Sequence, residues 1–132
     1  MREMSRAIRW LMLAVLVAPL AACGAKVECG YGAGSAEESL RGLFSAVAAD
    51  DPESACVYLD PRKSESSGFD WAQDLLARPE LEGKLASDIE FVEDVGAQMA
   101  SQHRYSIRVD SLEIAQTSVM EEPQGRFLVL PD

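Results

Sequence analysis

The N-terminal stretch decides how much of this chain is available to fold. Residues 1–9 carry three arginines and one glutamate, and residues 10–20 then run without a charge as WLMLAVLVAPL. A basic segment followed by such an apolar run is typical of a secretory signal. The run is about half of the roughly 20 residues that a membrane-spanning helix needs. We therefore expect it to direct export and then to be removed.

The end of the apolar run resembles the bacterial lipobox. In Leu20-Ala21-Ala22-Cys23 a branched residue and two small residues precede a cysteine. The resemblance implies that the Cys23 thiol takes a diacylglyceryl group, that residues 1–22 are cleaved off, and that Cys23 becomes an N-terminus acylated with chains such as palmitate. It implies a protein anchored by lipid to the extracytoplasmic face of the cell membrane. The alternative is an ordinary secretory signal, cut near the same alanines, which would release a soluble domain.

Removal of the signal leaves about 110 residues, enough for one domain with a modest core. The chain has 12 basic and 22 acidic residues; without the signal's three arginines and one glutamate, 9 and 21 remain, a net charge of −12. This charge repels nucleic acid and anionic lipid head groups, so we expect no nucleic-acid partner. We interpret the acidic residues as a solvated surface rather than as a dedicated cation site.

The three cysteines fit an exported protein. If Cys23 is consumed by lipid, Cys29 and Cys56 remain as an even pair, and we expect a disulfide between them. Closing this loop would contribute about 3 kcal/mol by restricting the unfolded chain. The alternative is that Cys56 is a buried thiol and Cys29 is free. Since no second histidine completes a ligand set, the sequence predicts no metal site, and we expect no cofactor.

Composition divides the chain into three parts. Residues 1–22 form the signal, and the glycine-rich segment 24–34, GAKVECGYGAG, predicts a flexible spacer behind Cys23. The expected parts are therefore a removed signal, a lipidated tether over 23–34 and a single domain over 35–132. No internal repeat is visible in that domain.

Helical signals dominate the first half of the domain. Ser35 and Glu38 form a capping box in front of apolar residues at helical spacing, which predicts a helix over 36–49. Asp51-Pro52 then starts a second helix, over 52–59, which Asp60-Pro61 stops.

The middle of the domain is less regular. We expect a polar loop over 62–68 and then a third helix, opened by Asp70-Trp71, with Trp71 as a plug of the core. Residues 80–87 continue as irregular helix.

Strand signals dominate the rest of the chain. Alternation of apolar and polar residues is clearest from His103 to Asp110, and Glu122-Pro123-Gln124-Gly125 has the composition of a turn. The expected strands cover 89–95, 103–109, 112–119 and 126–130. Over 89–95 a helix is the alternative, because Ser87 and Glu90 also satisfy a capping box, but the β-branched and aromatic content favours a strand. Helices followed by antiparallel strands predict an α+β fold, with N-terminal helices packed on one face of a curved sheet.

Two segments resemble the nuclear-transport-factor-two-like (cystatin-like) superfamily. They are the opening SAEESLRGLFSAVAADDPESACVYLDP, with its helix, break and second short helix, and the closing strand QGRFLVLPD. The resemblance implies a cone, in which a strongly bent sheet wraps around helices and leaves an open, apolar-lined cavity. It also implies that exported members of this kind bind ligands or partners.

The enzymes of this superfamily are of the ketosteroid-isomerase and polyketide-cyclase types. They use an aspartate base in an apolar pocket with a tyrosine or protonated acid beside it. The resemblance makes catalytic candidates of Asp70, Asp88, Tyr58, Tyr105 and the single histidine, His103. The structural alternatives are a helix cap for Asp70, a turn for Asp88, edge packing for the tyrosines and a place at the rim for His103.

These observations favour a noncatalytic, membrane-tethered module that binds a small apolar molecule or an envelope protein. The alternative is an isomerase-like or cyclase-like enzyme with a carboxylate base in the cavity. A third hypothesis is a domain that supports assembly of a larger envelope complex. The first two differ in one property, because the enzyme requires a cavity carboxyl group with a raised pKa.

Overall fold

The computed structural model describes residues 28–62, 65–99 and 101–131. The signal, the lipobox and Cys23 lie outside these residues, so the lipid anchor stays a prediction. In the described ranges, no helix combines the length and the apolar character needed to cross a membrane.

Helix α2 (Ala36–Ala48) begins where the sequence predicts. The Ser35 hydroxyl accepts a hydrogen bond of 3.2 Å from the Glu38 amide, which satisfies one of the free amides at the helix start. One face of α2 is buried, with Leu40, Leu43 and Phe44 almost fully enclosed. The expected helix over 52–59 is a short turn, α3 (Pro52–Ala55), that tightens into a 3₁₀ segment, η1 (Cys56–Tyr58).

Helix α4 (Glu65–Leu76) starts earlier than predicted. The expected loop over 62–68 is therefore wrong from Glu65 onward, and Asp70 lies inside the helix instead of opening it. Gly68 explains the difference, because a Cβ on this residue would come within 2.8 Å of the Leu59 side chain. A close contact across the fold thus outweighs the low helix propensity of glycine.

Trp71 of α4 packs in the core as predicted, with its ring 5.8 Å from that of Phe44. The expected irregular helix over 80–87 consists of two short 3₁₀ segments, η2 (Pro79–Leu81) and η3 (Ala86–Asp88).

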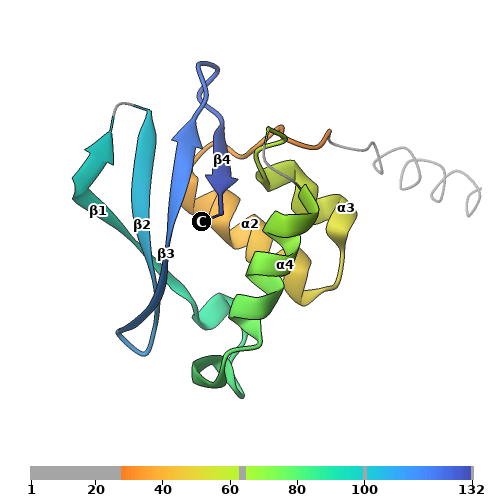
Figure 1. Cartoon of the computed structure of the whole chain (residues 1–132), viewed down its shortest axis with the longest axis vertical. Helices are drawn as coiled ribbons and strands as arrows, with labels where there is room; N and C mark the ends of the chain where they lie inside the picture. The colour runs from red at the N-terminus through yellow and green to blue at the C-terminus, as the bar shows by residue number, and fades with distance from the viewer. Residues whose placement is uncertain (1–27, 63–64, 100, 132) are drawn as a thin grey trace, which may run out of the picture.

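Four antiparallel strands follow in simple order: β1 (Glu90–Met99), β2 (Gln102–Val109), β3 (Leu112–Glu121) and β4 (Phe127–Leu130). The two-residue turn between β2 and β3 has positive φ at Asp110 and Ser111, the geometry that matches the twist of a hairpin. The α+β prediction is confirmed. Figure 1 shows the sheet on one side of the molecule and the helices on the other.

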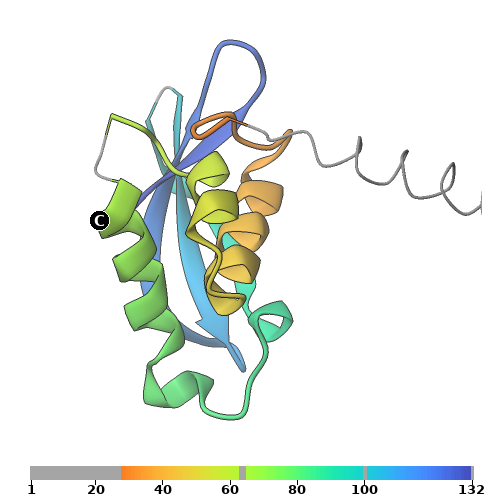
Figure 2. The same ribbon diagram turned by 90° about the vertical axis from the view of Figure 1, so that its right-hand side faces the viewer.

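The core lies between the two layers. Figure 2 shows α2 and α4 on the same face of the sheet. Ile107, Val119 and Val129 from three different strands are fully buried there, and Phe91 of β1 stacks on Phe44 of α2 at 5.7 Å. On β2, the alternate residues Ile107 and Val109 supply this face, as the period of a strand requires.

The edge of the sheet at β4 is covered by segments distant in sequence. The Phe127 amide donates to the Ala33 carbonyl at 2.9 Å, and the Asp60 amide donates to the Val129 carbonyl at 3.2 Å. Gly32 has a positive φ of 75° and lies against the Phe127 backbone, a contact that no residue with a Cβ would allow. These contacts satisfy backbone groups that a bare edge strand would leave unpaired.

The disulfide predicted between Cys29 and Cys56 is present, with the two Cα atoms 4.7 Å apart. Beside it, the amides of Gly30 and Gly32 donate to the carbonyls of Cys56 and Val57 at 2.9 and 2.8 Å. The second half of the expected tether over 23–34 is therefore fastened to the domain, and its first residues, up to 27, lie outside the described part.

Candidate functional site

Two of the catalytic candidates lie on the helix-facing side of β2, where charged groups from three strands meet. His103 Nδ1 is 2.8 Å from Glu93 Oε1 on β1, and its Nε2 is 3.3 Å from Glu121 Oε2 on β3. The imidazole is only 15% exposed. The hydrogen bond to Glu93 is the main reason that the pKa of His103 is raised, and Glu121 adds to it.

This arrangement suits an imidazolium that joins three strands. A protonated ring donates from both nitrogens, whereas a neutral ring would turn a lone pair toward a carboxylate. Tyr105, the other candidate on this face, has a raised pKa because of burial, and the charges of Glu93 and Glu37 add to the shift. The phenol therefore stays protonated well into the alkaline range.

The remaining catalytic candidates are not brought to this cluster. Asp70 points to solvent from α4, and Asp88 is exposed and accepts a hydrogen bond of 2.7 Å from the Leu85 amide, which is the expected turn role. Asp88 precedes Glu90, which pairs with Arg108 at the far end of β2 from His103. The Tyr58 ring lies against Gly42 of α2. Neither aspartate thus has the apolar surroundings that a catalytic base of the isomerase type needs.

A pocket of about 540 Å³ lies elsewhere, at the β4 edge of the sheet. Three segments line it: residues 30–31 beside the disulfide, the turn over 60–62, and the hairpin that joins β3 to β4. Leu128, Pro61 and the Tyr31 ring supply apolar surface, and the charged side chains are those of Asp60, Arg62, Glu122 and Arg126.

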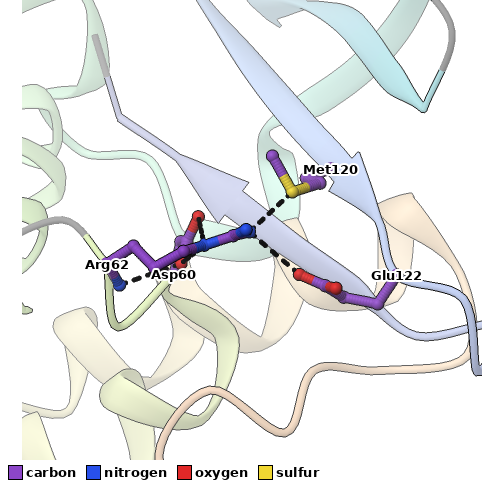
Figure 3. Close-up of polar contacts among 4 residues, drawn as sticks. All are labelled: Asp60, Arg62, Met120 and Glu122. Carbon is purple, nitrogen blue, oxygen red and sulfur yellow. Dashed lines mark hydrogen bonds and ion pairs between the residues drawn. The ribbon is translucent and has the colours of Figure 1, made fainter.

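One wall of the pocket is built around Arg62 (Figure 3). Its Nε is 2.9 and 3.1 Å from the two carboxylate oxygens of Asp60, and its Nη2 is 3.0 Å from Glu122 Oε1 and contacts the Met120 sulfur. The Asp60 side chain is only 3% exposed. The hydrogen bond to Asp60 is the main cause of a raised pKa for Arg62. Two carboxylates around one guanidinium leave this wall with a net charge of −1.

A second wall of the pocket is built around Arg126. Its guanidinium lies 4.3 Å above the centre of the Tyr31 ring, and its Nη2 donates to the Tyr31 hydroxyl at 2.8 Å. Stacking on an aromatic face and a hydrogen bond together fix the plane of the guanidinium. Among the residues with described positions, no carboxylate forms an ion pair with Arg126, so this wall carries a net charge of +1.

No family model, curated protein or solved structure matches this chain. The interpretation of the pocket therefore rests on its own geometry. In the described ranges, no three residues of the metal-binding types lie together as a metal site.

Sequence reasoning did not find this pocket. It assigned Asp60 to a helix stop, Arg62 to a polar loop, Glu122 to a turn and Tyr31 to the tether. One signal was present, because Tyr31 is the single aromatic residue in the glycine-rich segment 24–34. An aromatic side chain has little to pack against in a free spacer, whereas it buries a large apolar area when it packs as part of a pocket wall.

Proposed function

We propose that this protein is a membrane-tethered, extracytoplasmic lipoprotein that binds a small ligand without chemical conversion, in the pocket at the β4 edge. The observation that carries the proposal is the Asp60–Arg62–Glu122 wall, which holds side chains from separate segments in one arrangement. The pocket volume of about 540 Å³ falls within the range of roughly 300 to 1,000 Å³ found for ligand sites. A partly apolar lining with a few convergent polar groups also fits such a site.

The position of the pocket relative to the proposed anchor supports a role at the membrane. Tyr31, in the pocket wall, lies two residues after Cys29. The disulfide to Cys56 fixes Cys29 to the domain. An extended chain spans at most about 3.5 Å per residue, so the six residues from Cys23 to Cys29 reach no more than about 21 Å. The pocket would then stay close to the bilayer surface.

The nuclear-transport-factor-two-like cone also belongs to this proposal. A helix, a break, a second short helix and a closing strand at the sheet edge support it. The enzyme alternative finds less support, because Asp70 and Asp88 are both exposed. An exposed aspartate lacks the apolar surroundings that a catalytic base of this type needs.

The anchor is tested on the full chain, produced in a bacterium and extracted with detergent. Intact-mass measurement before and after reduction should show cleavage before Cys23, an added diacylglyceryl mass and one disulfide. A Cys23→Ser variant should lose the acyl mass and the normal processing. A mature protein that begins elsewhere, or that carries no acyl chain, would remove the tether from the proposal.

Ligand binding is tested by native mass spectrometry of the same extract. We expect a small molecule to co-purify and to be lost from a Tyr31→Ala variant, since Tyr31 is 49% exposed and its truncation opens the pocket without disturbing the core. Lys84→Gln is the matched control, because Lys84 pairs with Asp110 outside the pocket. Equal occupancy in all three proteins would contradict the assignment of the pocket.

A further inference from the structure

Two parts of the pocket lining carry opposite net charges, the Asp60–Arg62–Glu122 group and the Arg126–Tyr31 pair. Glu122 and Arg126 leave the two arms of one tight hairpin, in which the Glu122 amide donates to the Arg126 carbonyl at 2.7 Å and the Gly125 amide to the Glu122 carbonyl at 2.9 Å. Each side chain is then held by a partner on another segment, Glu122 by Arg62 and Arg126 by Tyr31. The pocket therefore holds a negative and a positive group, and among the residues that the structure describes no ion pair joins Glu122 to Arg126.

Each end retains capacity for a ligand. Only Oε1 of Glu122 is engaged by Arg62, and in the part of the chain that the structure describes, Oε2 has no hydrogen bond. A carboxylate accepts on both oxygens, so Oε2 can take an ammonium group. Arg126 donates to Tyr31 from Nη2 alone, which leaves further N–H groups of its planar fork for an oxyanion.

We propose that the pocket binds a small zwitterion, with its ammonium group at Glu122 and its phosphate or carboxylate at Arg126. This inference rests on the proposed function, because it names the ligand class of the same site. A ligand with a single charge compensates one wall and leaves the other without a partner. The chemistry is shared by the phosphoethanolamine head group of a membrane lipid and by free zwitterions of amino-acid type.

Calorimetric titration of the full chain in detergent micelles tests the charge requirement. The probes are glycerophosphoethanolamine and glycine as zwitterions, with ethanolamine and inorganic phosphate as single-charge fragments. We expect at least one zwitterion to bind about tenfold more tightly than either fragment, the effect of one extra charge-assisted hydrogen bond. Equal affinity for a fragment and the zwitterions would overturn the inference.

Matched variants assign the two ends. Arg126→Gln should weaken zwitterion binding about tenfold and leave ethanolamine binding unchanged, and Arg126→Lys should fall between, because it keeps the charge without the planar fork. Glu122→Gln should weaken zwitterion and ethanolamine binding alike and spare phosphate. Lys84→Gln should bind as the unmodified protein does. A uniform loss in every variant, the control included, would contradict the assignment.

The source of the zwitterion is decided in lipid nanodiscs. If the lipid head group occupies the pocket, discs of phosphatidylethanolamine should block added glycerophosphoethanolamine, whereas discs of phosphatidylglycerol should not. If the ligand is free in solution, affinity should be the same in both discs. Binding of no zwitterion in either disc overturns the inference. The proposed function still stands in that case if another molecule co-purifies and is lost in Tyr31→Ala, and it fails as well if none does.

Discussion

Two clusters in this molecule each hold a cation between two carboxylates, and they use neighbouring residues to do it. Glu121 turns to the helix-facing side and meets His103 with Glu93, while Glu122 turns the other way and meets Arg62 with Asp60. The first cluster is built from three paired strands. The second joins a turn before α4 to the β3–β4 hairpin, and it forms the wall of a pocket.

The difference lies in the cation and in what holds the carboxylates. Histidine has an ordinary pKa of about 6.5, and the pKa of His103 is raised above it. The imidazolium therefore joins the two carboxylates only below this raised pKa. Arginine remains charged at every pH the protein meets, so its wall has a constant charge. Strand pairing alone positions the histidine cluster, whereas the arginine cluster depends on segments that tertiary contacts bring together. Four predictions test this contrast.

The largest effect is expected from removing the disulfide with Cys29→Ala and Cys56→Ala together. The unfolding free energy should fall by about 3 kcal/mol, because the unfolded chain regains the freedom of the closed loop. Urea unfolding of the full chain measures it. The amides of Gly30 and Gly32 should also exchange faster with solvent. A parallel change in the pKa of His103 would show that the two clusters are not independent.

Asp60→Asn should have the next largest effect. It keeps an acceptor for the Arg62 amide, which lies 2.9 Å from Oδ1, but it removes a buried charge that the guanidinium compensates. We expect a loss of about 1.5 kcal/mol in unfolding free energy, read from the urea midpoint. Lys84→Gln, at an exposed ion pair, should leave the midpoint within experimental error. Comparable losses in both variants would mean that the burial of Asp60 is immaterial.

The histidine cluster should make stability depend on pH in the opposite sense to a carboxylate. Because the folded pKa of His103 is raised, its contribution is fully present below the unfolded pKa of about 6.5 and is lost as pH rises through the folded pKa. The free energy of unfolding, measured from pH 6 to 9, should fall with pH at a slope that corresponds to less than one proton released. His103→Gln should abolish this fall. An unchanged slope in this variant would assign it to other groups.

The smallest effect separates the two adjacent glutamates. Glu121→Gln should lower the pKa of His103, and by less than Glu93→Gln does, since Glu121 is 3.3 Å away and Glu93 is 2.8 Å away. Glu122→Gln should leave that pKa unchanged, because its side chain belongs to the other cluster. NMR titration of the single imidazole measures all three variants. If Glu122→Gln shifted the pKa of His103 as much as Glu121→Gln does, the two clusters would not be electrostatically separate.

Elements with local signals were predicted well. The cap at Ser35 placed the start of α2, and the alternation from His103 to Val109 placed β2, because a side chain's own neighbours decide both features. The pairing of Cys29 with Cys56 followed from counting cysteines. The start of α4 was missed, because Gly68 has a low helix propensity. It lies in the helix because the Leu59 side chain leaves no room there for a Cβ, and this contact cannot be predicted from the local sequence.

By itself, the sequence determined the order of helices and strands, the faces they bury and the residues available for a disulfide, since each depends on spacing along one stretch of chain. Only the tertiary structure decided that Tyr31 is a wall rather than part of a spacer, and that Asp60, Arg62 and Glu122 meet. Such charges come from segments about 60 residues apart. No periodicity in the sequence links Arg62 to Glu122. They meet because the turn over 60–62 lies beside β4, where the Asp60 amide donates to the Val129 carbonyl.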